Sequence, residues 1–522
     1  NIFFININEK ILILFLIFFS LIINQYYGNK GIFPVDSFAH FDSGFRVLLG
    51  EDPFKDYWVV SGPLLDYIQA IFFYFFGVNW QSYIFHASLF NAILTISTFL
   101  ILRNFNLKVY YSFFYSILFA VLAYPSSGTP FVDHHSAFFS LLGIYSLILG
   151  IKNEKKIYWI LLPILLGLGF LSKQVPTAYV IISTILILIF FSIAKKKYYW
   201  IKYSFISSFL FIFFLLIFGN FREIDLSSFL EQYIFFPLTI ADQRFDNYQL
   251  TFRGVISHFH FIYISLIPLV YFNLRSIIKN KNYVKEKNFF YFLILISFAF
   301  SLIFHQISTK NQTFIFFLIP ILFAFSNLNI NQLKFKLSNT ILALLLLTCL
   351  FATFKYHMRF NEGRKFHELN YVNFQLSADA IKIDKKLEGL KWITPQKKND
   401  PNKEINQINE VKLYLLNDSR NKMLISNFSF FSVILNEKLF SPGRWYLSDG
   451  TSHPLKGNKH FNSYKNLLIN IIKKNSIAVI YTIDPLESSI LYNYIDKGCF
   501  IEREISKILK SYELKNCNEI NS

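Results

Sequence analysis

Charged residues are scarce in this chain of 522 residues, and their scarcity decides its class. Asp, Glu, Lys and Arg together make up 16% of the sequence, whereas hydrophobic residues make up 53% and Phe alone contributes 65. Soluble domains carry about 25% charged residues. The apolar residues also come in runs long enough to cross a hydrocarbon core, which takes about 20 residues. The composition therefore excludes an ordinary soluble enzyme and predicts a polytopic membrane protein.

Several common site motifs are also missing. The sequence has no P-loop, no Gly-rich nucleotide loop and no internal repeat, and its three cysteines do not have the spacing of zinc ligands. The net charge of +18 would suggest nucleic acid in a soluble protein. Here the lysines cluster in short loops between apolar runs, so membrane topology explains them better. We predict no nucleic-acid partner and assign no residue to a metal site, but a divalent cation remains an open alternative for the cofactor.

Hydropathy predicts about eleven transmembrane helices. We interpret Ile11 to Ile23 as part of a retained helix, because no small-residue cleavage site follows it. Leu64 to Phe76 is short and carries Asp66, so we interpret it as an interfacial or re-entrant helix. The predicted spans are roughly 11–26, 81–102, 110–124, 134–151, 157–171, 177–194, 203–219, 256–273, 289–305, 313–328 and 339–354.

The distribution of basic residues predicts the orientation of these spans. With the N-terminus in the cytoplasm, Lys and Arg are concentrated in the short cytoplasmic loops and are fewer in the longer opposite loops, as the positive-inside rule requires. Interfacial aromatics follow two lysine clusters closely, at Tyr158-Trp159 and Tyr198-Tyr199-Trp200. We therefore predict a multi-pass protein of the bacterial inner (plasma) membrane whose C-terminal part lies outside the cytoplasm.

The chain changes character after the last predicted span. Residues 1–354 form the predicted transmembrane domain, and residues 355–522 a mixed α/β extracytoplasmic (periplasmic) domain of a normal size. Apolar runs of strand length predict strands at Lys412–Leu416, Lys422–Ile425 and Ser476–Ile483, and helices at Phe430–Leu439 and Ser463–Lys473. Cys499 and Cys517 are either separate thiols or a disulfide, and an oxidising periplasm favours the disulfide.

The first extracytoplasmic loop, from Tyr27 to Pro63, holds an unusual set of polar residues. Its carboxylates include Asp36, Asp42, Asp52 and Asp56. Ionisable groups held beside a bilayer indicate a functional site. The remaining polar candidates fall on the same predicted side, whereas a transporter more often carries such groups at mid-membrane in broken helices. They are Asp133-His134-His135, Ser172-Lys173-Gln174, Arg222, and His305 with Lys310.

Four short motifs, in this order and on one side, carry a family resemblance. They are Val35-Asp36-Ser37, Gly50 to Trp58 with its Pro-Phe-x-Asp core, Gly62-Pro63 and Asp133. Over residues 1–350 the chain resembles the glycosyltransferases of the GT-C fold, more closely the bacterial members grouped with protein O-mannosyltransferase and the lipid A aminoarabinose transferase. The resemblance implies transfer of a sugar from a polyprenyl-phosphate donor to a glycan, lipid or protein acceptor outside the cytoplasm, by direct displacement with inversion.

The resemblance assigns the catalytic base to the acidic residue just after the first span, which is Asp36. A base must deprotonate the acceptor hydroxyl; the alternative is an Asp that caps an interfacial helix. Asp56 is a second catalytic candidate. Trp58 lies two positions further along and can stack on a sugar ring. The alternative is that Asp56 is a turn residue and Trp58 an interfacial aromatic. We expect Asp42 and Asp52 to be solvated loop charges.

A departing lipid phosphate needs a cation. Lys173 is the only basic residue of its predicted loop, with Gln174 beside it, although a lone Lys can also snorkel to the interface. Arg222 is the second candidate, and His305 and Lys310 are weaker ones. In the C-terminal part, Arg444 lies in a segment, Ser441 to Tyr446, that we expect to be a structured turn packed on its domain.

Asp133-His134-His135 admits several interpretations. Asp and His together can bind a divalent cation or position an acceptor, or the Asp can cap a helix. We count Asp133 as catalytic and His134 as substrate-binding, and expect His86 to be a packed core histidine. Rival functions are a surface-polysaccharide polymerase or ligase that acts on polyprenyl-linked glycans, a transporter or flippase, and a membrane scaffold.

Overall fold

The computed structural model describes residues 7–240, 251–309, 315–333, 338–484, 486, 489–515 and 517. The chain forms two compact units, each assembled from three separate stretches of sequence. Unit 1 consists of Asn1–Gly28, Ile84–Leu215 and Tyr248–Phe366, and unit 2 of Asn29–Tyr83, Leu216–Asn247 and His367–Ser522. The first loop thus shares a unit with the C-terminal segment, and the predicted domain boundary near residue 355 stays a prediction.

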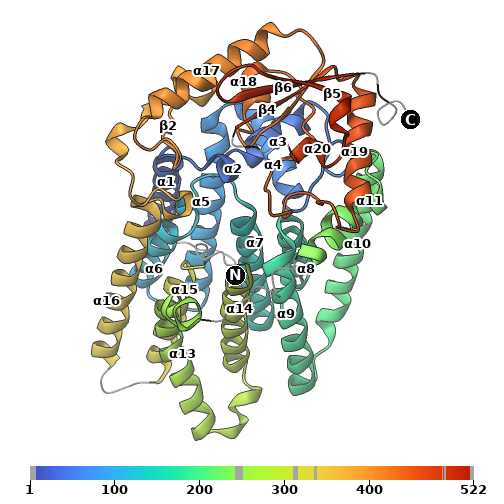
Figure 1. The fold of residues 1–522 in the computed structure, drawn as a ribbon. Helices are drawn as coiled ribbons and strands as arrows, with labels where there is room; N and C mark the ends of the chain where they lie inside the picture. The colour runs from blue at the N-terminus through green and yellow to red at the C-terminus, as the bar shows by residue number, and fades with distance from the viewer. Residues whose placement is uncertain are drawn as a thin grey trace. The chain divides into compact units, whose positions relative to one another are not determined.

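Unit 1 is built from helices (Figure 1). Two of its helices, α5 (Trp80–Asn104) and α10 (Tyr199–Phe221), have one end in unit 2. The other α-helices are α1 (Ile7–Gly28), α6 (Val109–Leu122), α7 (Val132–Asn153), α8 (Lys156–Ser172), α9 (Gln174–Lys195), α13 (His260–Lys279), α14 (Lys287–Thr309), α15 (Leu318–Leu333) and α16 (Ser338–Tyr356). Short turns of helix are η1 (Tyr124–Ser126), η3 (Arg253–Ser257), η4 (Lys281–Lys285), η5 (His357–Glu362) and η6 (Lys365–His367), whose last residue belongs to unit 2.

Within the described residues, nine helices are long and apolar enough to cross a membrane. The predicted spans 157–171 and 313–328 correspond to two shorter apolar helices, α8 and α15. The third shorter one is α4 (Pro63–Phe76), which the sequence predicts to be interfacial or re-entrant. The predicted polytopic helical fold with a small C-terminal sheet is therefore confirmed.

Helix α7 lies at the centre of unit 1. Nearly all of its side chains are buried, whereas α10 leaves large apolar side chains such as Phe209, Phe213 and Phe214 exposed, as a lipid-facing helix does. Small residues on α7 allow close packing: a Cβ on Gly143 would lie 2.9 Å from the Leu166 side chain of α8. Asp133 lies in the first turn of this buried helix.

Unit 2 contains every strand that the structure describes (Figure 1, orange to red). Its first-loop helices are α2 (Pro34–Ser37), α3 (Ala39–Leu48) and α4, and residues 216–247 add α11 (Leu226–Leu230) and η2 (Glu231–Phe235). The C-terminal segment contributes η7 (Phe374–Leu376), β1 (Ala378–Asp379), η8 (Ala380–Lys382), η9 (Lys385–Leu387), β2 (Lys391–Trp392), α17 (Pro401–Asn417), β3 (Lys422–Ile425), α18 (Phe431–Leu435), α19 (Phe461–Lys474), β4 (Val479–Ile483), α20 (Ser489–Tyr492), η10 (Lys497–Cys499), β5 (Phe500–Glu504) and β6 (Leu509–Leu514).

The strands form a two-stranded antiparallel pair and one mixed sheet. In the mixed sheet the order is β3-β4-β6-β5, with β3 parallel to β4 and the other pairs antiparallel. Met423 pairs with Ile480 in this register, and both pack in one core with Leu468 of α19. The predicted strand 422–425 and the predicted helix 463–473 are confirmed. The predicted strand 476–483 is shortened to β4, and the predicted helix 430–439 to α18.

The predicted strand at Lys412–Leu416 is wrong, because this segment is the end of helix α17. The Asp400 side chain accepts a hydrogen bond of 3.1 Å from Lys403 N, and Pro401 begins the helix. Residues at helical spacing, including Ile408, Val411 and Leu415, share its buried face. The strand-length apolar run belongs to this longer helical pattern, which the shorter window missed.

Candidate functional site

Asp36 lies in the first turn of α2, a short helix that Pro34 begins. Its side chain is half-buried. Backbone pairing holds the preceding segment: Gly31 N donates to Lys391 O and Ile32 N to the carbonyl of residue 393, at 3.1 Å each. The C-terminal part of unit 2 therefore fixes the position of the first loop at the residue predicted to be the base.

Gly31 is required by this arrangement. Its φ of +69° lies in the left-handed region, and a Cβ there would lie 2.6 Å from Leu369 Cδ1. After α2 begins, Ser37 Oγ accepts a hydrogen bond of 3.0 Å from Phe33 N and contacts His367 Nδ1 at 3.2 Å. The α2 segment is thus tied down on both sides of Asp36.

A buried ionic network joins α3, α4 and the C-terminal segment within unit 2. The Asp66 carboxylate is fully buried and lies 2.8 Å from His40 Nδ1, 2.9 Å from Tyr57 Oη and 3.1 Å from Arg444 Nη1. Ser43 Oγ also donates to it. Arg444, 3% exposed, donates further to the carbonyl of Ser61. Buried charges need such pairing, because an unpaired one is strongly destabilising.

The network keeps Asp66 ionised. Burial by itself would raise its pKa, but the charge of Arg444 and the hydrogen bond from His40 outweigh burial, so the net effect is a lowered pKa. For His40, burial prevails over the attraction of Asp66 and lowers the pKa of the imidazole. The structure thus places a carboxylate and a guanidinium, both charged, in the interior of unit 2.

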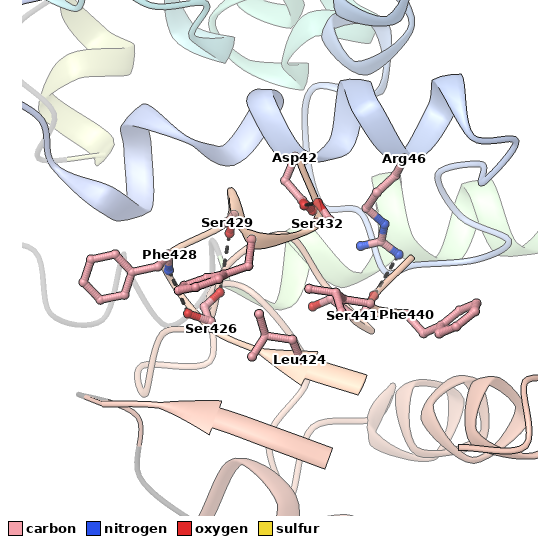
Figure 2. Close-up of a pocket in the computed structure, with 11 residues that line it drawn as sticks. Asp42, Arg46, Leu424, Ser426, Phe428, Ser429, Ser432, Phe440 and Ser441 are labelled. Atoms are coloured by element: carbon pink, nitrogen blue, oxygen red, sulfur yellow. Dashed lines mark hydrogen bonds between the residues drawn. The ribbon is translucent and has the colours of Figure 1, made fainter. Parts of the chain in front are cut away.

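Asp42 and Arg46 lie on the same face of α3, above the loops of the C-terminal segment (Figure 2). With four serines, Ser426, Ser429, Ser432 and Ser441, they line a small pocket. Ser432 Oγ donates to Asp42, which is 7% exposed. Burial raises the pKa of Asp42, although the charge of Arg46 opposes this. The expectation that Asp42 is a solvated loop charge is therefore wrong, because the C-terminal segment covers α3.

Arg46 is engaged on two sides. Its Nε donates to Glu51 Oε2 at 2.6 Å and its Nη2 to the carbonyl of Ser441 at 2.9 Å. Its guanidinium also lies over the Tyr57 ring, 4.2 Å from the centroid. Nη1 is buried and has no hydrogen-bond partner among the described residues. Both N–H groups of this nitrogen are thus without a partner among the described residues, beside the pocket of Figure 2 that Arg46 lines.

Asp52 and Arg222 form an ion pair of 2.7 Å. Asp52 is 3% exposed and also accepts a hydrogen bond of 2.9 Å from Tyr67 Oη. The expectation that Asp52 is solvated is wrong as well, because residues 216–247 bring Arg222 to the first loop. Arg222, the second phosphate candidate, already has its charge balanced by this carboxylate.

Asp56 closes the turn of the first loop. Its Oδ2 accepts a hydrogen bond of 2.9 Å from Asp52 N, and Phe54 in the same turn has a φ of +72°. Its Oδ1 lies 3.2 Å from Lys474 Nζ. These contacts give Asp56 a structural task in the turn, whatever further role it has.

Trp58 packs inside unit 2 and is 3% exposed. Its ring meets Phe236 and Tyr464 edge-on, with centroids 5.6 and 5.7 Å away. A sugar could stack on Trp58 only if this ring left the core.

In unit 1, three predicted residues meet at the N-terminal end of α7. Lys173 Nζ lies 2.7 and 2.8 Å from the two carboxylate oxygens of Asp133, and His305 Nε2 lies 2.9 Å from Oδ1. Helix α8 ends at Ser172, and Lys173 takes an extended conformation between α8 and α9. The Lys173 side chain is 21% exposed, whereas Asp133 and His305 are buried.

Histidines continue this polar cluster into the helix bundle. His134 Nε2 lies 3.0 Å from Ser126 Oγ, and its ring stacks on Tyr124 at 4.9 Å. His135 bonds to the Tyr124 hydroxyl and lies 3.0 Å, nitrogen to nitrogen, from His86. His86 is therefore part of a polar chain and not only packed among apolar groups. In the described part of the chain, no group of three or more His, Cys, Asp or Glu side chains is arranged to hold a metal ion.

Asp66 and Arg444 were not singled out from the sequence as a site. Asp66 is the one charged residue of the apolar stretch Leu64–Phe76, which is a usable signal. Arg444 is 378 residues further along the chain, so its partner could not be read from spacing. Of the candidates named above, Lys310 lies outside the described residues.

Cys499 and Cys517 are joined by a disulfide, with Cα atoms 5.6 Å apart. The bond connects the end of η10 to the segment after β6. Cys349, by contrast, is a free and buried thiol of α16.

Comparison with known families gives one match. Residues 60–218 match the family described as dolichyl-phosphate-mannose-protein mannosyltransferase. This stretch contains Asp66, Asp133 and Lys173. A search among curated proteins found no match. Over residues 60–218 the chain is similar to the GT-C membrane glycosyltransferases, and the resemblance drawn from its sequence is confirmed.

Proposed function

We propose that this protein transfers a sugar from a polyprenyl-phosphate donor to an acceptor on the outer side of the bacterial inner membrane. The observation that carries the proposal is the similarity of residues 60–218 to a family of polyprenyl-type sugar-phosphate-dependent transferases. Multiple membrane-crossing helices suit a lipid-linked donor. The acceptor is a glycan, a lipid or a protein.

Asp36 is the proposed base. Its carboxylate removes the proton of the acceptor hydroxyl while the hydroxyl oxygen attacks the anomeric carbon. The bond from that carbon to the phosphate oxygen breaks, and its electrons leave with the lipid phosphate. One displacement inverts the anomeric configuration and needs no covalent enzyme intermediate. The rigid attachment of α2 supports this role, because a base must be held close to its target.

Lys173 is the proposed cation for the departing phosphate. An ammonium has three donors, and two of the short Lys173 contacts go to Asp133. The side chain remains 21% exposed, so a third donor is available to a phosphate oxygen. Asp133 and His305 then act by holding Lys173 in place. Gln174 and His134 remain candidates for donor contacts.

The other candidates have smaller proposed parts. Arg222 is a second and weaker cation, because Asp52 already balances its charge, and Asp56 positions the first loop. The proposed outside location of the C-terminal segment fits its disulfide, because disulfides persist in oxidising compartments.

The test is sugar transfer by the purified chain in proteoliposomes. The probe is polyprenyl-phosphate mannose, with a glycan and lipid extract of the source membrane as acceptor, and the readout is released polyprenyl phosphate. Asp36→Asn should slow release by about 10²–10⁴-fold. The exposed Glu410→Gln, which makes the same chemical change on α17, should not.

Three results would contradict the proposal. The first is an unchanged rate of release with Asp36→Asn. The second is movement of the lipid-linked sugar across the bilayer without bond cleavage, as a flippase would move it. The third is a product that grows by whole oligosaccharide units, which identifies a polymerase or ligase.

A further inference from the structure

A cleft lies within unit 2 beside the turn of the first loop. It encloses about 500 Å³, which falls in the range of pockets for small ligands. Its walls are the first-loop turn from Gly50 to Asp56, the segment from Lys438 to Phe440, and the C-terminal end of α19. Neither Asp36 nor Lys173, the proposed base and the proposed phosphate cation, lines this cleft.

Four lysines from three parts of the chain line the cleft. They are Lys55, Lys438, Lys473 and Lys474. Lys55 pairs with Glu223 at 2.7 Å and Lys474 with Asp56 at 3.2 Å. No ion pair involves Lys438 or Lys473 within the described ranges. The cleft therefore carries positive charge that its own carboxylates do not balance.

The cleft also offers a buried acceptor. Glu51 lines it and is 5% exposed. Its Oε2 takes the hydrogen bond from Arg46, whereas its Oε1 is buried with no hydrogen-bond partner among the described residues. Buried polar atoms are normally hydrogen-bonded, so this carboxylate oxygen is suited to accept a hydrogen bond from a ligand donor such as a hydroxyl group. Phe440 and Leu467 provide an apolar wall beside it.

A simpler explanation covers only part of this arrangement. Lys473 and Lys474 are in the last turn of α19, where cations are favourable to the helix dipole. Lys55 and Lys438 belong to other segments, so that effect does not place them in the same cleft. Nor does it account for Glu51, which lines the same cleft and whose buried Oε1 has no hydrogen-bond partner among the described residues.

We propose that this cleft binds an acidic saccharide, one that carries carboxylate or phosphate groups beside its hydroxyls. The anionic groups meet Lys438 and Lys473, a sugar hydroxyl donates to Glu51 Oε1, and an apolar sugar face lies against Phe440. A ligand with anions alone would leave Glu51 unsatisfied, and a neutral sugar would leave the lysines unpaired. The inference rests on the proposed function in one respect: the acidic saccharide is the class of acceptor that the enzyme glycosylates.

The test measures binding to the full chain in nanodiscs of neutral lipid by calorimetry. Trigalacturonate is the acidic probe and maltotriose its neutral match. Trigalacturonate should bind and maltotriose should not, and the double variant Lys438→Glu/Lys473→Glu should weaken binding at least tenfold. The double variant Lys438→Gln/Lys473→Gln, which adds no negative charge, should weaken it in the same direction. Lys456→Glu/Lys459→Glu carries the same charge change on exposed lysines outside the cleft and should leave binding unchanged.

Several outcomes overturn the inference. The acidic-saccharide site is refuted if maltotriose binds as well as trigalacturonate. It is also refuted if the cleft variants bind trigalacturonate as the wild type does, or if the control pair loses as much affinity as they do. Binding only of inorganic phosphate or of glycerophosphoglycerol, the headgroup of an anionic lipid, assigns the cleft to free phosphate or lipid instead. Asp36→Asn separates the two proposals, because it should bind trigalacturonate as the wild type does. If the chain transfers sugar but does not bind trigalacturonate, only the acidic-saccharide site is refuted. If it binds trigalacturonate but does not transfer sugar, only the proposed function is refuted.

Discussion

The buried carboxylate Asp66 provides the sharpest test of how unit 2 is held together. Asp66→Asn keeps the shape of the side chain but removes the negative charge that faces Arg444 at 3.1 Å. Arg444 is 3% exposed, so its charge is left in the interior without a counterion. Breaking a buried ion pair in this way costs about 3–5 kcal/mol. In a unit of this size, one kcal/mol shifts the unfolding temperature by about 2–4 °C.

We therefore expect Asp66→Asn to lower the unfolding temperature by roughly 6–20 °C. The measurement is thermal unfolding of the detergent-solubilised chain at pH 7, followed by tryptophan fluorescence. Adding Arg444→Gln should recover part of the loss, because the second change removes the unpaired cation. The double variant should thus be less destabilised than the sum of the single variants.

The pH dependence has a definite sign. The pKa of Asp66 is lowered in the folded chain, so its stabilisation is present above the unfolded-state pKa of about 4 and is lost as the pH falls through the folded-state value. The difference in unfolding temperature between the wild type and Asp66→Asn should therefore be largest at neutral pH and should decrease only below about pH 4.

Asp42→Asn is the matched control. Asp42 is another buried carboxylate of unit 2, but burial raises its pKa, so its negative charge contributes less to stability than that of Asp66, whose pKa is lowered. An amide keeps the hydrogen bond from Ser432, and we expect stability within about 1 kcal/mol of the wild type. Equal losses for Asp42→Asn and Asp66→Asn would refute the reasoning, since burial alone would then explain both.

Three further predictions test other parts of the chain. Gly31→Ala brings a Cβ within 2.6 Å of Leu369 and should lower sugar transfer at least about tenfold by moving Asp36, with the donor Kd unchanged; an unchanged rate would argue against the positioning role. Lys173→Gln should slow single-turnover transfer about 10²–10³-fold, and a change in acceptor KM alone would contradict a phosphate contact. Cys499→Ser should lower the free energy of unfolding by about 3 kcal/mol, and dithiothreitol should destabilise the wild type but not the variant.

The sequence determined the membrane class and much of the secondary structure. Long hydrophobic runs indicate segments that are buried in lipid. Such segments form helices, because in lipid every backbone polar group must be hydrogen-bonded within the segment itself. The predicted helical fold follows from that constraint alone, as does the placement of Leu64–Phe76 among the short helices. The family resemblance follows from the order of short motifs near Asp36 and Asp133, which is a property of the sequence itself.

Only the tertiary structure decided which charges are paired. Asp42 and Asp52 read as solvated loop residues, yet both are buried, because segments hundreds of residues away cover the first loop. Asp66 meets Arg444 and Asp133 meets Lys173 for the same reason: a carboxylate leaves water only where a distant cation compensates the loss of hydration. Sequence spacing does not reveal which distant residues meet. Apolar runs and periodicity are local properties of the sequence, so they could predict helices but not the pairing of charges.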